Sequence, residues 1–72
     1  MKIYVTFGFQ HIHKINGKIF DRNCVGVIDR PNYEEGRKAI TDIFDNVFCT
    51  TYTEEHIMKN LHYYPRGIIE IE

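Results

Sequence analysis

The sequence predicts an α+β fold in one domain, residues 1–72, with the element order ββαβαβ. Apolar residues alternate from Lys2 to Phe9, an Asn16-Gly17 pair follows, and a helical periodicity begins after Pro31. The first two patterns indicate a long N-terminal β-hairpin in a mainly antiparallel sheet. The third indicates one main helix packed on one face of that sheet.

The turn of the predicted hairpin sets its register. Asn and Gly both accept the positive φ angles that a two-residue type I′ turn requires. A regular hairpin with this turn places Ile15 opposite Lys18, His13 opposite Phe20, His11 opposite Arg22, Phe9 opposite Cys24, and Val5 opposite Ile28. Odd-numbered residues of the first arm then share the core face. A bulge at Gly8 or over 21–23 would alter this facing.

The main helix is predicted over about residues 33–45. Asn32 can cap its first N–H groups, Glu35 can reach back to the cap, and Glu34 suits the positive end of the helix dipole. A strand rich in Val, Phe, Thr and Tyr is predicted after it, over 47–52.

A short second helix and a last strand complete the prediction. Thr53 is the expected cap of this helix, in which Ile57 and Leu61 face inward. Pro65 and Gly67 interrupt the chain before a strand over 68–71. Both helices are expected on the same face of the sheet.

Composition indicates a small, soluble, cytoplasmic protein. A hydrophobic share of 43% is enough for a packed core, and no apolar run approaches the ~18 residues of a membrane span. Cys24 and Cys49 form no C-x-x-C unit and are expected to be buried side chains in a reducing cytosol. A core this small often gains stability from a second subunit, so a homodimer is one expectation. No cofactor is expected.

His11 and His13 are the residues best suited to hold a metal or move a proton. Two residues apart on a strand, they point the same way and share a face with Arg22. A zinc site needs at least three protein ligands, and Asp21 is expected on the opposite face. The pair is therefore interpreted first as part of a binding surface with Arg22. A metal-dependent hydrolase, with His56 or His62 as third ligand, is the least favoured alternative.

Aromatic and cationic residues also gather near the C-terminus. Tyr64 and Arg66 lie in the segment Tyr-Tyr-Pro-Arg-Gly, a composition that suits a nucleobase or phosphate. A nucleotide or nucleic-acid binding protein that uses His11, His13, Arg22, Tyr64 and Arg66 is thus an alternative function. Glu54 and Glu55 are explained by a helix start, where acidic residues offset the dipole.

Three segments resemble one group of proteins. These are Thr6-Phe7-Gly8-Phe9-Gln10-His11-Ile12-His13, Tyr52-Thr53-Glu54-Glu55 and Tyr64-Pro65-Arg66-Gly67-Ile68-Ile69-Glu70. Together with Phe44 and Phe48, they look like a group of small uncharacterised proteins encoded by bacteriophages and prophages. The resemblance implies a phage setting, in which compact, non-catalytic proteins bind and disable a host protein.

The leading expectation combines this setting with the absence of a catalytic motif. No Gly-rich phosphate loop, nucleophile elbow or zinc-binding cluster is found in the sequence. We therefore expect a small accessory protein of phage type in the cytoplasm of the host cell. A non-catalytic role is favoured over an enzymatic one. Its expected partner is a host protein, such as a component of an antiviral defence system, which it inhibits in the manner of an anti-CRISPR protein.

Overall fold

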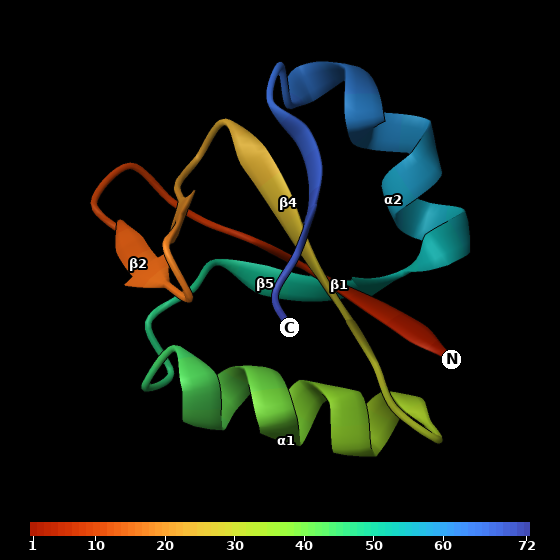
Figure 1. Cartoon of the computed structure of the whole chain (residues 1–72). Helices are drawn as coiled ribbons and strands as arrows, with labels where there is room; N and C mark the ends of the chain where they lie inside the picture. Colours follow the sequence, from red (N-terminus) through yellow and green to blue (C-terminus); the bar gives the residue numbers. More distant parts are fainter.

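The computed structural model describes residues 1–72 and shows an α+β fold with two helices and six strands (Figure 1). The elements in chain order are β1 (Lys2–Thr6), β2 (His13–Ile15), β3 (Lys18–Phe20), β4 (Cys24–Asp29), α1 (Tyr33–Ile43), β5 (Thr50–Thr53), α2 (Glu54–Asn60), a 3₁₀ turn (Leu61–Tyr63) and β6 (Gly67–Glu70). The predicted class is confirmed. The predicted order ββαβαβ is not matched, because each arm of the expected hairpin is divided into two strands.

The sheet topology is mainly antiparallel, as predicted. Four strands form one sheet in the order β5-β1-β4-β6, in which only the β4–β6 pair is parallel. Strands β2 and β3 form a separate two-stranded sheet. The expected long hairpin is therefore a short one joined to a pair of strands inside the larger sheet.

The tip of the predicted hairpin is confirmed. Asn16 and Gly17 have φ angles of 52° and 76°, as a type I′ turn requires. In β2 and β3, His13 lies opposite Phe20, which is the predicted register.

The register is wrong beyond the tip. Strand β1 pairs with β4 so that Val5 lies opposite Gly26 instead of Ile28. The cause is a turn that begins at Gly8 and interrupts the ladder between β1 and β2. A register shift of two residues preserves the alternation of faces, so Val5 stays in the core. Phe9 lies in the turn, outside the ladder, and is exposed.

The start of α1 follows the sequence prediction. The side-chain oxygen of Asn32 accepts a hydrogen bond from the N–H of Glu35 at 2.9 Å, which satisfies one of the free donors of the first turn. The helix ends two residues earlier than predicted. Asp45 and Asn46 have positive φ angles of 51° and 61°, and this left-handed conformation cannot continue a right-handed helix.

The two helices cover opposite faces of the four-stranded sheet. The larger core, on the α1 side, contains Ile3, Val5, Phe7, Phe20, Cys24, Ile28, Ile40, Phe44 and Ile71. The smaller core, on the α2 side, contains Tyr4, Val25, Val27 and Ile57. The expectation that both helices share one face is therefore wrong. Strands β1 and β4 are apolar on both faces, so each face needs a cover.

The last strands begin and end close to their predicted positions. Strand β5 starts at Thr50 rather than 47, because Val47 and Phe48 belong to the connection from α1. Strand β6 starts at Gly67, and the N–H of Ile71 still donates to the carbonyl of Val27 at 3.0 Å. Neither helix is long and apolar enough to cross a membrane.

Candidate functional site

His13 connects the hairpin to the end of α1. Its Nε2 lies 2.6 Å from the carbonyl oxygen of Val47. A carbonyl oxygen can only accept, so Nε2 carries the proton and donates. The imidazole also packs edge-on against the Phe44 ring, with centroids 4.9 Å apart, and lies beside Phe7. His13 is thus engaged in holding β2 against the larger core.

His11 closes the turn that interrupts the ladder. Its backbone N–H donates to the Gly8 carbonyl at 3.1 Å, and its Nδ1 accepts from the Gly8 N–H at 3.1 Å. The ring lies against Gly8, where an added Cβ would come within 3.3 Å of Nδ1. The two histidines therefore make separate local contacts. Nowhere in the structure do three His, Cys, Asp or Glu side chains gather in a position to hold a metal ion.

The turn at Gly8 presents two large apolar side chains to solvent. Phe9 is 81% exposed and Ile12 is 69% exposed. The guanidinium carbon of Arg22 lies 4.0 Å from the centroid of the Phe9 ring, in a cation–π arrangement. Phe9, Ile12 and Arg22 together form a surface that we call the loop patch. A shallow groove of about 340 Å³ lies among them, with Asp21 and Asn23 as its other walls.

Arg66 anchors the turn that carries Arg22. Its guanidinium pairs with the carboxylate of Asp21 at 3.1 Å, and its N–H donates to the carbonyl of Asn23 at 2.9 Å. Asp21 also accepts from the N–H of Asn23 at 2.9 Å. These contacts neutralise the one carboxylate in the groove, whereas Arg22 makes no ion pair. The loop patch therefore keeps an unpaired positive charge beside its apolar surface.

Tyr64 lies apart from the loop patch. Its ring packs against the smaller core under α2, and its pKa is raised, mainly by burial and then by the nearby Tyr52. The five residues proposed from the sequence, His11, His13, Arg22, Tyr64 and Arg66, are not joined to one another by any hydrogen bond or ion pair. Only Arg22 and Arg66 share a neighbourhood, through the Asp21–Asn23 turn.

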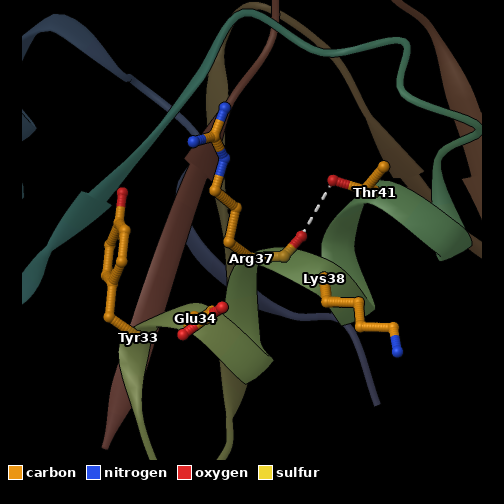
Figure 2. A pocket seen from close by; sticks show the side chains of 5 residues that line it. All are labelled: Tyr33, Glu34, Arg37, Lys38 and Thr41. Atoms are coloured by element: carbon orange, nitrogen blue, oxygen red, sulfur yellow. Dashed lines mark hydrogen bonds between the residues drawn. The ribbon is translucent and has the colours of Figure 1, made fainter.

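A second groove, of about 520 Å³, lies on α1 and was not predicted from the sequence. Its walls are Tyr33, Glu34, Arg37, Lys38 and Thr41 (Figure 2). Figure 2 shows the Tyr33 and Arg37 side chains rising from the same side of the helix, whereas Lys38 points away from them. The hydroxyl of Thr41 donates to the carbonyl of Arg37 at 2.9 Å. The signal in the sequence is the four-residue spacing of these polar side chains, which places them on one helix surface.

Comparison with known proteins gives no identification. No protein-family model, curated protein or solved structure matches this chain. The resemblance to small phage-encoded proteins stays a prediction.

Proposed function

We propose that this protein is a non-catalytic binding module that docks onto another protein through the loop patch. The observation that carries the proposal is the exposure of Phe9 and Ile12 next to the unpaired guanidinium of Arg22. Aromatic residues and arginine are enriched among the residues that contribute most to protein–protein affinity. The loop patch has this composition, because an exposed aromatic residue, an exposed aliphatic residue and an arginine surround one groove.

Two fixed turns support this use of the loop patch. The turn under Phe9 is closed by the paired contacts between Gly8 and His11. The turn under Arg22 is closed by Asp21 and Arg66. A surface that is ordered before binding loses less entropy when a partner covers it. Covering a Phe or Ile side chain contributes roughly 1.5–3 kcal/mol each.

Charge defines the kind of partner. Because Asp21 is already paired with Arg66, the free charge of the loop patch is the guanidinium of Arg22. A matching surface offers an apolar pocket for the Phe9 ring and a carboxylate at its rim for Arg22. In the phage setting that the resemblance implies, we propose a host protein as the bearer of this surface, such as an antiviral defence component that the module inhibits by occupying it.

Affinity capture with matched variants tests the proposal. The tagged protein, a Phe9→Ala/Arg22→Ala variant and a Met58→Ala/Tyr63→Ala control are passed over lysate of a bacterial host. Met58 and Tyr63 are also exposed, but they lie on α2 and the turn after it. We expect one protein to be retained by the wild type and the control and lost with the loop variant, and to bind again in purified form.

Two outcomes would contradict the proposal. One is retention of the same protein by the loop variant with unchanged affinity. The other is that the purified protein associates only with itself, which light scattering would show as a dimer that Phe9→Ala/Arg22→Ala disrupts. In that case the loop patch is a homodimer contact.

The α1 groove favours a second candidate function, the binding of a phosphate-bearing ligand such as a nucleotide. Arg37 and Lys38 make no ion pair there, and Tyr33 offers a ring face beside Arg37. Guanidinium and ammonium groups bind phosphate, and such binding weakens as salt increases. Calorimetry with mononucleotides and short RNA at two salt concentrations tests this function. Uptake that Arg37→Ala abolishes would support it, and no uptake would exclude it.

A further inference from the structure

The two histidines of the His-x-His pair use their ring nitrogens in opposite ways. His13 donates a hydrogen bond from Nε2 to a carbonyl oxygen. His11 accepts a hydrogen bond at Nδ1 from a backbone N–H. The first arrangement is compatible with a protonated ring, and the second requires a neutral one. This difference concerns the turn that presents Phe9 and Ile12.

We propose that His11 is a pH-sensitive latch on the loop patch: its protonation releases the Gly8–His11 turn that fixes Phe9 and Ile12 at the surface. The effect on the turn rests on geometry alone. Its consequence for binding rests on the function proposed above.

The latch depends on whether Nδ1 of His11 carries a proton. Neutral His11 carries its proton on Nε2, which leaves the Nδ1 lone pair free to accept from the Gly8 N–H. The imidazolium form carries a proton on both nitrogens and has no acceptor. Two donors would then face each other at 3.1 Å, with the ring still pressed against the Gly8 backbone. The imidazolium must rotate away, and the Gly8 N–H loses its partner.

The surroundings of His11 offer no compensation for the added charge. The imidazole makes no ion pair, and its side-chain hydrogen bond is the one to Gly8. The charged groups of the adjoining turn are Arg22, which lies over the Phe9 ring, and Asp21, which is paired with Arg66. On β2 the nearest titratable groups in sequence are His13 and Lys14. No carboxylate therefore forms an ion pair with the His11 ring in this structure.

The release is local. The backbone hydrogen bond from the His11 N–H to the Gly8 carbonyl does not involve the ring and is present in either protonation state. The turn therefore loses one of its two hydrogen bonds and keeps the other. The contact of His13 with Val47 uses Nε2 as the donor, and a protonated ring keeps this donor. Acid therefore loosens the Phe9 loop while β2 stays attached to the larger core.

Nuclear magnetic resonance on the isolated, ¹⁵N-labelled protein tests the latch without any partner. The pH is lowered from 8 to 5 while the His11 ring nitrogens and the Gly8 amide are followed. We expect Nδ1 to be unprotonated at high pH. As the ring gains its proton, we expect the Gly8 amide to lose its hydrogen-bonded shift and about fivefold of its protection from exchange, corrected for the intrinsic rate.

Two variants separate the latch from a general effect of acid. In His11→Asn, the side-chain Oδ1 takes the place of Nδ1 as an acceptor that does not titrate, so the Gly8 amide is expected to stay constant with pH. In His13→Asn, the Gly8 amide is expected to titrate as in the wild type. The proposal is overturned if the wild-type Gly8 amide is unchanged while His11 titrates, or if neutral His11 carries its proton on Nδ1.

The result of this test of the latch does not depend on the proposed function. A turn that opens in acid while no host protein binds would leave the latch standing and remove the binding module. If a partner is captured, its affinity for the wild type is expected to fall from pH 8 to pH 5, and its affinity for His11→Asn is expected to stay constant. A parallel fall for both proteins would remove the link between the latch and binding.

Discussion

Strand β1 and the loop after it belong to one apolar run, yet they place their phenylalanines in opposite environments. Phe7 is 4% exposed and packs edge-on against Phe44, with centroids 5.1 Å apart. Phe9, two residues further, is 81% exposed beneath the Arg22 guanidinium. The turn at Gly8 separates them. Alternation therefore predicts the facing of a side chain only while the strand ladder continues, and beyond it the same residue type lies in solvent.

The most damaging change to the buried region is Phe44→Ala. This ring is 1% exposed, meets Phe7 and Phe20 edge-on, and also contacts His13. Removing a large aromatic side chain from a core costs about 3–5 kcal/mol, which is much of the stability of a small domain. Urea unfolding followed by circular dichroism measures the loss. Val47→Ala, at an exposed neighbour, is the control and is expected to change the midpoint little.

Gly36→Ala is expected to have the next largest effect. A Cβ at this position would come within 2.3 Å of Ile3 Cδ1, so α1 must move away from β1. Overpacking of this kind costs about 1–3 kcal/mol, more than the gain of up to ~1 kcal/mol in helix propensity. Ile3→Ala removes both Cδ1 and Cγ1 and leaves only Cβ, at 2.9 Å, so unfolding should show that Gly36→Ala costs less in that background than in the wild type. A Gly36→Ala variant as stable as the wild type would mean that α1 does not lie this close to the sheet.

Alkaline pH probes the buried region without substitution. Burial is the main cause that raises the pKa of Tyr4, of Tyr64 and of the Cys24 thiol; at Tyr4 the hydrogen bond to Glu54 adds to it. The folded protein thus holds these protons to higher pH than the unfolded chain, and unfolding releases them. The contribution of these three groups to the free energy of unfolding is therefore constant below the ordinary pKa values, 9.0 for the thiol and 10.0 for the phenols, and falls as pH rises above them.

Urea midpoints between pH 7 and pH 11, measured with a reductant present, check this dependence. Tyr4→Phe removes one of the three groups, so its curve should fall less steeply than the wild-type curve. A wild-type midpoint that rises with pH in this range would contradict the burial of all three groups.

Local signals in the sequence predicted local structure well. The Asn16-Gly17 turn and the Asn32 cap act within a few residues, and both are found where the sequence indicated. The face on which α2 packs could not be predicted in this way. The inward positions Ile57 and Leu61 tell which side of the helix is buried, and they do not tell which face of the sheet receives it. The continuous apolar runs of β1 and β4 were the available signal for two covered faces.

The candidate site depends on contacts between residues that are far apart in the sequence, so less of it could be predicted from the sequence than of the fold. Arg22 is a site residue predicted from the sequence, and it lies at the loop patch. The regular register predicts Phe9 in the core; the interruption at Gly8, which the sequence offered only as an alternative, places this ring in solvent. The pairing of Asp21 with Arg66 joins residues far apart in the chain, so no local pattern indicates it. Strand spacing predicts that His11 and His13 lie on one face as a unit, whereas the turn at Gly8 gives them separate contacts.

The smallest change in stability is expected for Phe9→Ala, and its comparison with Phe7→Ala separates the two regions most sharply. Phe7→Ala should cost about 3–5 kcal/mol, like other losses of a core aromatic. Phe9→Ala removes the same side chain two residues away, and its free energy of unfolding should stay within about 0.5 kcal/mol of the wild type, because the ring buries little surface. Urea unfolding of the two variants side by side measures both. Equal losses would mean that Phe9 packs into the core in solution, and the loop patch would then not exist as a binding surface. A stable Phe9→Ala variant that has lost at least tenfold in affinity for a captured partner would show that the chain keeps this ring outside its core for recognition.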